Sequence, residues 1–512
     1  MTRSHYLLLF TIGLLFTSII ALFEPIPGYL DSDYYFAGGL QLVKGNGFTE
    51  PYLWNYLDNP AGLPHPSHSY WMPLASIVSA GGMLLAGQST YSASRILFIL
   101  ITALVPPITA SLAYSFSNRT NMALISGFLA VFSGYHAPFM PVTDNFGIYI
   151  LLGGLYFLLV RLQRPWFWFG VITGFMSLAR NDGILWLGIS VILIYLRKNQ
   201  LVTIKEMTSA FILLVAGFIL IMAPWYVRNY FAYGSVMAPG GGLTLWMTSY
   251  NQTFTYPATK LSYDSWIMHG SQNIIRDRLW ALGQNLQNAV AAHGSIILVP
   301  FIGSGIWLHR TDERVKAGCL GWILLLATMT LVFPFAGARG GFFHAGSAFQ
   351  TLWWSLAPLG LAASVDKAIT RCWFRESSQK IFQIMFIQVV LIITLFICWV
   401  RLFKLGWGEG EQKYPEVENQ LVVSGALPMD IVMVRNPPGY TMLTNRRTIV
   451  IPEGDISVLL SVADRYGGSY LVLEPQAALP GIKDLYEQPD SDTRFIYLGE
   501  VDDIRLFSIV GE

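Results

Sequence analysis

The sequence predicts a polytopic α-helical membrane protein with a smaller C-terminal α/β domain. Of its 512 residues, 53% are hydrophobic and only 12% are charged, which is about half the charged fraction usual in soluble domains. Apolar runs close to the length of a membrane span recur through most of the chain, and roughly the last hundred residues instead alternate short β-branched runs with turns. The 32 basic and 31 acidic residues nearly cancel, which excludes a strong overall field that would attract nucleic acid.

About eleven segments are apolar and long enough for a helix that crosses a hydrocarbon core of roughly 30 Å. The first follows Arg3 and lacks a small-residue cleavage site after it, so we expect an uncleaved anchor. The predicted spans are residues 6–23, 92–116, 120–137, 145–163, 166–179, 183–196, 207–227, 292–308, 316–335, 345–364 and 381–400.

The orientation follows from the basic residues, which are retained preferentially in cytoplasmic loops. With the N-terminus inside, one loop after another on the inner side is basic, provided that the apolar stretch 71–87 lies in the interface or re-enters instead of crossing. We therefore expect a multi-pass protein of the cytoplasmic membrane, in contact with membrane lipids, whose loops 24–91 and 228–291 and C-terminal domain face outward. The inner-loop residues are Arg119, Arg161, Arg164, Arg197, Lys198, Lys205, Arg310, Arg314, Lys316, Lys367, Arg371, Arg375 and Lys380.

The chain divides into a transmembrane module, residues 1–405, and a soluble extracytoplasmic α/β domain, residues 411–512. The second part contains "DIVMVR", "RTIVIP", "YLVLEP" and "RFIYLGE", which are typical of short strands separated by helices and turns. This domain either binds an acceptor or covers a site on the membrane module. The three cysteines are too scattered to indicate a disulfide framework.

The segment "DSDYYFAGGLQLVKGNGF" opens the first outer loop and places Asp31 and Asp33 where the chain leaves the first span. Tyr35 follows Asp31 by four positions. A carboxylate in such a place can accept a proton from a hydroxyl group that attacks a substrate. The alternative is that both carboxylates are only solvated loop residues.

Further polar residues stand at the predicted outer ends of the spans. Charged groups beside membrane spans tend to mark function, and guanidinium groups bind phosphate well, although some of these residues could instead form structural ion pairs or reach the headgroups. The residues are Asp144 in "PVTDN", Arg180 in "ARNDG", Arg228 in "PWYVRNY", and Arg339 and His344 in "GARGGFFHAG".

His65 and His68 lie in the Pro-rich segment "NPAGLPHPSHSYWMPL". They could ligate a transition metal or contact a phosphate. Two histidines fall short of the four or so ligands of a closed metal site, so the segment could equally serve only to seat an in-plane helix.

The arrangement of residues 1–400 resembles the GT-C superfamily of integral-membrane glycosyltransferases, which includes protein O-mannosyltransferases, aminoarabinose transferases and the catalytic subunit of oligosaccharyltransferase. Asp31 takes the place of the first-loop catalytic aspartate, and Asp144 stands where relatives carry an acidic residue in the second outer loop. "ARNDG" and "PWYVRNY" are similar to further patterns of the superfamily. Many relatives have Asp-Glu where this chain has Asp31 and Ser32 and supplies its second carboxylate at Asp33, so either aspartate could be the base.

The resemblance implies an inverting transfer of a hexosyl or pentosyl group from a polyprenyl-phosphate-linked donor to a protein, glycan or lipid acceptor on the extracytoplasmic face. A first-loop aspartate would be the general base, and Asp33 and Asp144 are the other catalytic candidates. A divalent cation is a possible cofactor, with Asp144, His65 and His68 as candidate ligands. The candidate substrate-binding residues are Arg339, His344, Arg228, Arg180, Tyr35, His65 and His68.

Two other functional classes also explain many membrane spans. One is a lipid or glycolipid transporter or flippase, and the other is an envelope assembly protein whose outer domain binds a partner. Transporters commonly show repeated halves, which this sequence lacks, and the candidate polar groups gather on one face. The transferase is therefore the favoured prediction, and the absence of a nucleotide-binding motif favours a lipid-linked donor.

Overall fold

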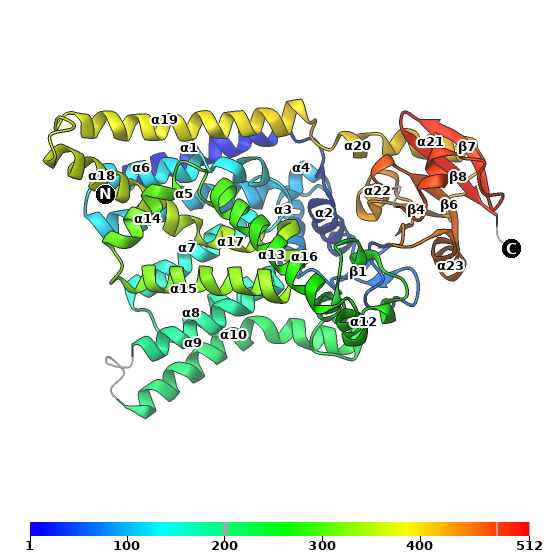
Figure 1. Ribbon diagram of the computed structural model, residues 1–512, viewed down its shortest axis with the longest axis horizontal. Coiled ribbons are helices and arrows are strands. Elements are labelled where there is room, and N and C mark those ends of the chain that lie inside the picture. Colours follow the sequence, from blue (N-terminus) through cyan, green and yellow to red (C-terminus); the bar gives the residue numbers. More distant parts are fainter. Residues whose placement is uncertain (198–202, 478–479, 511–512) are drawn as a thin grey trace.

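The computed structural model describes residues 1–197, 203–477 and 480–510. Helices fill a large body, and the C-terminal unit, residues 409–510, is attached at one end of it (Figure 1). Lys198, one of the predicted inner-loop residues, lies outside the described residues.

Each of the predicted spans contains a helix. Within the described residues, five helices are long and apolar enough to cross a membrane, namely those at Arg3–Ala21, Tyr91–Ser117, Ile204–Tyr233, Glu313–Val332 and Ser378–Val423. Most of the other helices of the body are shorter, so the count of eleven crossings remains a prediction. The helices are α1 (Arg3–Ala21), α5 (Ile96–Ser117), α6 (Thr120–Val131), α7 (Phe146–Leu162), α8 (Trp166–Ala179), α9 (Ile184–Leu196), α10 (Ile204–Tyr233), α14 (Val299–Leu308), α15 (Glu313–Ala327), α18 (Gln350–Thr370) and α19 (Ser378–Trp399).

Small residues let the helices of the body approach closely. A Cβ atom at Gly170 of α8 would lie 2.0 Å from the carbonyl oxygen of Leu214, and one at Gly217 of α10 would lie 2.1 Å from that of Phe167. Such contacts are typical of membrane helices, which associate through close packing because lipid offers no hydrophobic driving force between them.

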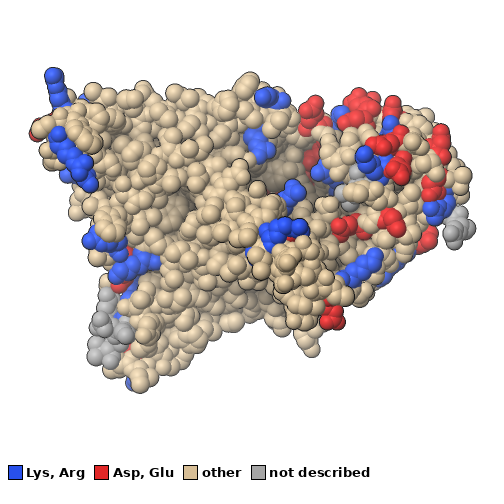
Figure 2. All heavy atoms as spheres, in the orientation of Figure 1, with Lys and Arg blue, Asp and Glu red and all other residues tan. Residues whose placement is uncertain are grey.

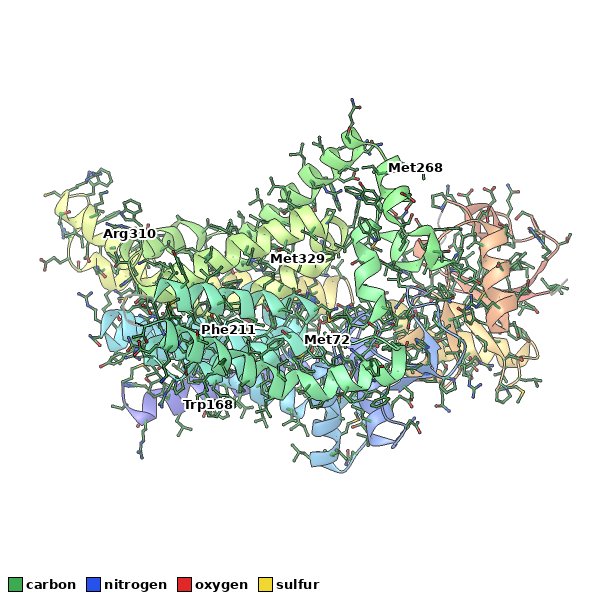
Figure 3. The ribbon with its side chains drawn as sticks, turned by 90° about the horizontal axis from the view of Figure 1, so that it is seen from below. Met72, Trp168, Phe211, Met268, Arg310 and Met329 are labelled. Atoms are coloured by element: carbon green, nitrogen blue, oxygen red, sulfur yellow. The ribbon has the colours of Figure 1, made fainter. Side chains whose placement is uncertain are left out.

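The outer surface of the body is apolar and poor in charge. Figure 2 shows charged side chains mainly at the two ends, with acidic residues concentrated on the C-terminal unit. Trp168 and Phe211 lie on the helical body, and Arg310 lies at the end opposite the C-terminal unit (Figure 3). Trp168 is 51% and Phe211 48% exposed, which is costly in water but favourable against lipid. These features place the protein in a membrane.

The first long loop is folded and contains two helices. α2 (Leu30–Val43) packs along α3 (Leu74–Ala86). Gly38 and Gly39 permit this contact, since a Cβ atom on either would lie about 2.5 Å from the hydroxyl of Ser76 or Ser79. α3 has 13 residues and is therefore roughly 20 Å long. Several helices of the body are no longer than this, so the non-crossing position of residues 71–87 remains a prediction.

The C-terminal unit is built on a six-stranded sheet of order β2-β5-β4-β6-β8-β7. Strands β2, β5, β4 and β6 are parallel to one another. β8 pairs antiparallel with β6, and β7 pairs antiparallel with β8. Successive side chains of a β-strand point to opposite faces of the sheet. Alternate residues of these strands accordingly belong to two separate apolar clusters. The elements are β4 (Ile431–Val434), β5 (Thr448–Val450), β6 (Gly468–Leu473), β7 (Phe495–Val501), β8 (Ile504–Ile509), α20 (Glu409–Gln412), α21 (Tyr414–Val423), α22 (Pro437–Thr444), α23 (Ile456–Tyr466) and α24 (Lys483–Glu487).

One edge strand of this sheet comes from the first long loop, which the sequence analysis had assigned to the membrane module. β2 (Tyr52–Leu53) pairs in parallel with β5. The hydroxyl of Tyr466 also donates a hydrogen bond of 3.0 Å to the carbonyl of Pro60. A strand of two residues is too short to leave a sequence pattern. The first loop therefore joins the C-terminal unit to the membrane body.

Candidate active site

Three side chains from distant parts of the chain meet where the helical body faces the C-terminal unit. Nδ1 of His344 lies 3.9 Å from Oδ2 of Asp31, and its Nε2 lies 3.8 Å from Oδ2 of Asp144. Each residue offers a ligand atom, and these atoms lie within 4.8 Å of one another. We call Asp31, Asp144 and His344 the acidic triad.

Asp31 lies in the first turn of α2, where the helix dipole favours a negative charge. Its side chain is 29% exposed, so a second molecule can approach it. The hydroxyls of the next residue, Ser32, and of Thr143 are 2.9 Å apart. This contact ties the first turn of α2 to the segment that carries Asp144.

Asp144 is buried and held by two hydrogen bonds. Its Oδ2 accepts a bond of 2.7 Å from the hydroxyl of Tyr29, and its Oδ1 accepts one of 2.5 Å from the backbone of Asn145. The side-chain amide of Asn145 donates to the hydroxyl of Tyr35. Tyr35 therefore lies beside the triad as a supporting residue. The sequence analysis did not select Tyr29, two positions before Asp31, or Asn145, the last residue of "PVTDN".

His344 lies in a short helix, α17 (Phe342–Gly346). The chain bends before this helix at Gly340, whose φ of 134° is strained for residues other than glycine. The ring of Phe146 packs edge-on against the imidazole with centroids 4.1 Å apart, which fixes the imidazole between the two carboxylates.

The electrostatics of the triad favour a bound cation. Burial, together with the nearby carboxylate of Asp144, raises the pKa of Asp31 to about 8. Burial raises the pKa of Asp144 to about 6, against the opposing effect of the Tyr29 hydrogen bond. Burial and the charge of Arg180 lower the pKa of His344, which leaves the imidazole neutral and able to ligate a metal. Two carboxylates and an imidazole form a donor set that suits divalent cations.

The arginines selected from the sequence occupy different positions. Arg180 lies close enough to lower the pKa of both Asp31 and Asp144, and it also forms an ion pair of 2.7 Å with Asp182. Arg339 is exposed, with its guanidinium 5.4 Å from the ring centroid of Tyr250. Among the described residues, no carboxylate forms an ion pair with Arg339, so its charge remains available to a ligand.

The side chain of Arg228 is bound to the first long loop. Its guanidinium donates to the carbonyls of Phe48 and Ser67 at 2.9 and 2.8 Å and lies 4.8 Å from the ring centroid of Trp225. The structure therefore gives Arg228 a role in holding the loop, and it does not bring this residue to the triad.

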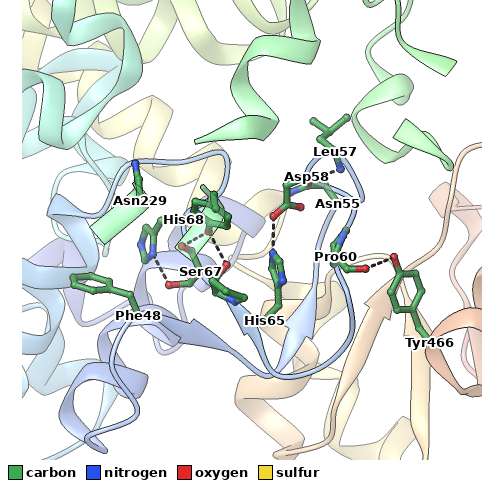
Figure 4. A network of polar contacts seen from close by, with 12 residues as sticks. Phe48, Asn55, Leu57, Asp58, Pro60, His65, Ser67, His68, Asn229 and Tyr466 are labelled. Carbon is green, nitrogen blue, oxygen red and sulfur yellow. Dashed lines mark hydrogen bonds and ion pairs between the residues drawn. The ribbon is translucent and has the colours of Figure 1, made fainter. Parts of the chain in front are cut away.

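His65 and His68 are buried in a polar network of their own (Figure 4). Nε2 of His65 lies 2.6 Å from Oδ2 of Asp58. Both ring nitrogens of His68 have hydroxyl partners, Ser67 at 2.7 Å and Ser76 at 3.1 Å. The two imidazoles therefore do not share a ligand position, and neither is part of the triad.

Asp33 faces away from the triad. It is fully buried, and its Oδ2 accepts a hydrogen bond of 2.8 Å from the side-chain amide of Asn436 in the C-terminal unit. Residues two apart on an α-helix point about 200° away from each other. Because α2 is helical here, Asp31 and Asp33 cannot enter the same site.

No protein-family model and no curated protein sequence matches the chain. Solved structures do match it. ArnT from Cupriavidus metallidurans, bound to undecaprenyl phosphate, is similar over 99% of this chain and 98% of its own, with a TM-score of 0.57 and 11% identity. The oligosaccharyltransferase of Archaeoglobus fulgidus in the apo form is similar over 95% of this chain and 71% of its own, with a TM-score of 0.54 and 12% identity.

The archaeal enzyme has also been solved in complex with Zn and sulfate, where the similarity covers 94% of this chain and 69% of that one, with a TM-score of 0.54 and 12% identity. Both neighbours are GT-C glycosyltransferases. At these identities the likeness concerns the fold, so the chain has the fold of GT-C glycosyltransferases over nearly its whole length.

Proposed function

We propose that this protein is a membrane glycosyltransferase that moves a hexosyl or pentosyl group from a polyprenyl-phosphate-linked donor to an acceptor hydroxyl on the extracytoplasmic face. The observation that supports this most directly is the acidic triad, which combines a partly exposed carboxylate with a donor set for a cation. The structural neighbours include complexes with undecaprenyl phosphate and dolichol phosphate, which is the chemical class of the proposed carrier.

The orientation proposed from the sequence suits this function. The triad lies at the end of the body that contacts the C-terminal unit, and basic Arg310 lies at the opposite end. If the basic end is cytoplasmic, as the distribution of basic residues favours, both the triad and the C-terminal unit face outward, where a lipid-linked sugar is presented.

In the proposed reaction, the acceptor oxygen attacks C1 of the sugar as the bond from C1 to the phosphate oxygen breaks. The electron pair of that bond leaves with the polyprenyl phosphate. The ionised form of Asp31, which its raised pKa makes a stronger base than a free aspartate, accepts the acceptor's proton on its exposed carboxylate. Attack opposite the leaving group inverts the configuration at C1. We therefore propose Asp31 as the first-loop base, and the contact of Asp33 with Asn436 supports this choice over Asp33.

Charge develops on the leaving phosphate, and cationic groups near it lower the barrier. Arg339 is proposed to bind this phosphate because its guanidinium is exposed and free of carboxylate partners within the described residues. Arg180 contributes positive charge deeper in the site. A divalent cation held by Asp31, Asp144 and His344 would supply further charge against the phosphate when bound.

The test is transfer of radiolabelled sugar from a panel of polyprenyl-phosphate sugars by the purified full-length protein. Asp31→Asn should reduce transfer by at least about a hundredfold, and Asp264→Asn, which changes an exposed carboxylate on the other long loop, should leave it unchanged. Equal transfer by the wild type and Asp31→Asn would refute the assigned base. If no donor is consumed and a labelled lipid instead crosses between leaflets in proteoliposomes, the protein is a transporter.

A further inference from the structure

The C-terminal unit contacts the same helix turn that carries Asp31. In that turn, three consecutive residues point to three different partners. Asp31 faces His344, Ser32 is bonded to Thr143, and Asp33 is bonded to Asn436. The first turn of α2 is therefore held from one side by the membrane module and from the other by the C-terminal unit.

Asn436 is the centre of this second attachment. One hydrogen bond from its side-chain amide goes to Asp33 at 2.8 Å, and another goes to Oε1 of Glu411 in α20 at 2.9 Å. Its side-chain oxygen accepts a bond of 3.2 Å from the backbone of Gly439 and so caps the N-terminus of α22. All the hydrogen-bonding atoms of the Asn436 side chain are thus engaged. Its orientation is fixed by the helix that it caps.

The contact is buried and closely packed. Asp33 is 0%, Glu411 7% and Asn436 8% exposed. A Cβ atom on Gly439 would lie 2.6 Å from the amide nitrogen of Asn436 and 3.1 Å from Oδ2 of Asp33. Only glycine at this position lets α22 approach α2 closely enough for the bond to form.

The linker between α19 and the C-terminal unit supports the same region. The indole of Trp407 donates a hydrogen bond of 2.9 Å to the carbonyl of Ile26 and packs over Gly28. Its ring also lies edge-on to Tyr29, with centroids 5.9 Å apart, and Tyr29 is the donor to Asp144. The chain on both sides of Asp31 is therefore in contact with residues that belong to the C-terminal unit or lead into it.

We propose that Asn436, acting through Asp33, is a positioning residue that orients the first turn of α2 and thereby aims Asp31 at His344 and Asp144. The C-terminal unit is then a structural part of the active site. This inference rests on the proposed function for its effect on catalysis, but its structural claim about α2 does not.

The experiment uses the full-length protein with four variants. Asn436→Ser keeps a good helix cap but is too short to reach Asp33. Asp33→Asn removes the acceptor charge. The exchanged variant combines Asp33→Asn with Asn436→Asp, which swaps donor and acceptor. It also carries Glu411→Gln, because an aspartate at position 436 can no longer donate to the Glu411 carboxylate, and it can restore the bonds while still capping α22. Arg465→Gln is the matched control, because Arg465 also joins the C-terminal unit to the first loop, with bonds to Asn59 and Pro60, but does not contact α2.

The first readout is amide hydrogen exchange over residues 30–37, which does not depend on the identity of the reaction. Exchange should accelerate about tenfold in Asn436→Ser, as expected for loss of a hydrogen bond to a charged group, and less in Asp33→Asn, whose side-chain oxygen can still accept the bond as a neutral group. It should return toward the wild-type rate in the exchanged variant and stay unchanged in Arg465→Gln. Unchanged exchange in Asn436→Ser, or equal acceleration in Arg465→Gln, would overturn the proposal.

The second readout is sugar transfer. A misplaced catalytic group costs up to about a hundredfold in rate, so kcat should fall between tenfold and a hundredfold in Asn436→Ser with little change in KM for the donor. The exchanged variant should recover most of this loss. A wild type that transfers no sugar would refute the proposed function, while exchange would still decide the attachment of α2. Wild-type kcat in Asn436→Ser, despite faster exchange, would overturn the positioning role.

Discussion

The hydroxyl of Tyr29 donates a hydrogen bond of 2.7 Å to Oδ2 of Asp144, a residue 115 positions away. The same carboxylate oxygen lies 3.8 Å from Nε2 of His344. Tyr29 therefore holds one of the proposed metal ligands by the atom that would face the cation. Removing a group that orients a metal ligand in this way typically lowers metal affinity by about tenfold to a hundredfold.

Tyr29→Phe should weaken binding of Mn²⁺ to the purified protein by about tenfold to a hundredfold, because it removes this bond and keeps the ring. The measurement is the Mn²⁺ dissociation constant from electron paramagnetic resonance of the free ion. The matched control is Tyr233→Phe, which removes a half-buried tyrosine hydroxyl bonded to the carbonyls of Pro66 and Ser67 outside the triad. Equal weakening in both variants would show that the effect is not specific to Asp144.

His344→Ala should reduce Mn²⁺ affinity further than Tyr29→Phe, because it removes a ligand of the triad. His68→Ala is the comparison, since this imidazole is buried and bonded to two serine hydroxyls and is expected to leave the affinity unchanged. The same titration decides the point. If His68→Ala abolishes binding and His344→Ala does not, the metal lies in the first long loop and the triad is not its site.

Arg339→Ala should affect sugar transfer, whereas Arg228→Ala should affect the stability of the fold. Arg339 is exposed, and surface substitutions usually change stability by less than about 0.5 kcal/mol, so this variant should lose transfer activity by tenfold or more at an unchanged melting temperature. Arg228 holds two backbone carbonyls of the first loop, so Arg228→Ala should lower the melting temperature by several degrees. The measurements are thermal unfolding and donor KM for each variant, and a reversed pattern would contradict both assignments.

Glu474→Gln should change how stability depends on pH. Glu474 is 7% exposed, accepts a hydrogen bond of 2.9 Å from Tyr414, and has a pKa raised by burial. The folded state therefore binds a proton more tightly than the unfolded state. The resulting stability is complete below the usual glutamate pKa of about 4.3 and is lost as pH rises from there through the raised pKa, at about 1.4 kcal/mol per pH unit.

A glutamine at position 474 can accept the same hydrogen bond from Tyr414, and because it does not ionise, it loses no stability as the pH rises. The melting temperature of Glu474→Gln should therefore match the wild type near pH 4 and exceed it near pH 8, as measured by intrinsic fluorescence in buffers of equal ionic strength. Glu416→Gln, which changes an exposed carboxylate on the neighbouring helix α21, is the control. A wild type whose stability rises between these pH values relative to Glu474→Gln would contradict the assigned direction.

The predicted spans correspond to helices because their positions depend on composition alone. A backbone segment within lipid must satisfy its own hydrogen bonds, and an apolar run of sufficient length does so only as a helix. The triad could be predicted only in part. Asp31, Asp144 and His344 were each selected, but Asp144 was placed with His65 and His68 as a candidate metal ligand, whereas the structure places it with His344 and Asp31.

The motif that contains Asp31 and Asp33 did not predict that the two side chains point in different directions. Both were selected because they share one short segment, but that segment is helical, and a helix turns residues two apart to nearly opposite sides. A helical assignment for residues 30–43 would have separated them. The partner of Asp33, Asn436, lies 403 positions away, and nothing in the local sequence connects the two.

The sequence by itself determined that this is a membrane protein, where its helices lie, and which polar residues are unusual enough to examine. These follow from the cost of placing polar groups in hydrocarbon, which acts on each segment separately. Only the tertiary structure decided that His344 lies between two carboxylates, that the first loop supplies a strand to the C-terminal sheet, and that Asp33 is bonded to that unit. Each of these depends on contacts between segments far apart in the chain, where packing and directional hydrogen bonds determine which side chains meet.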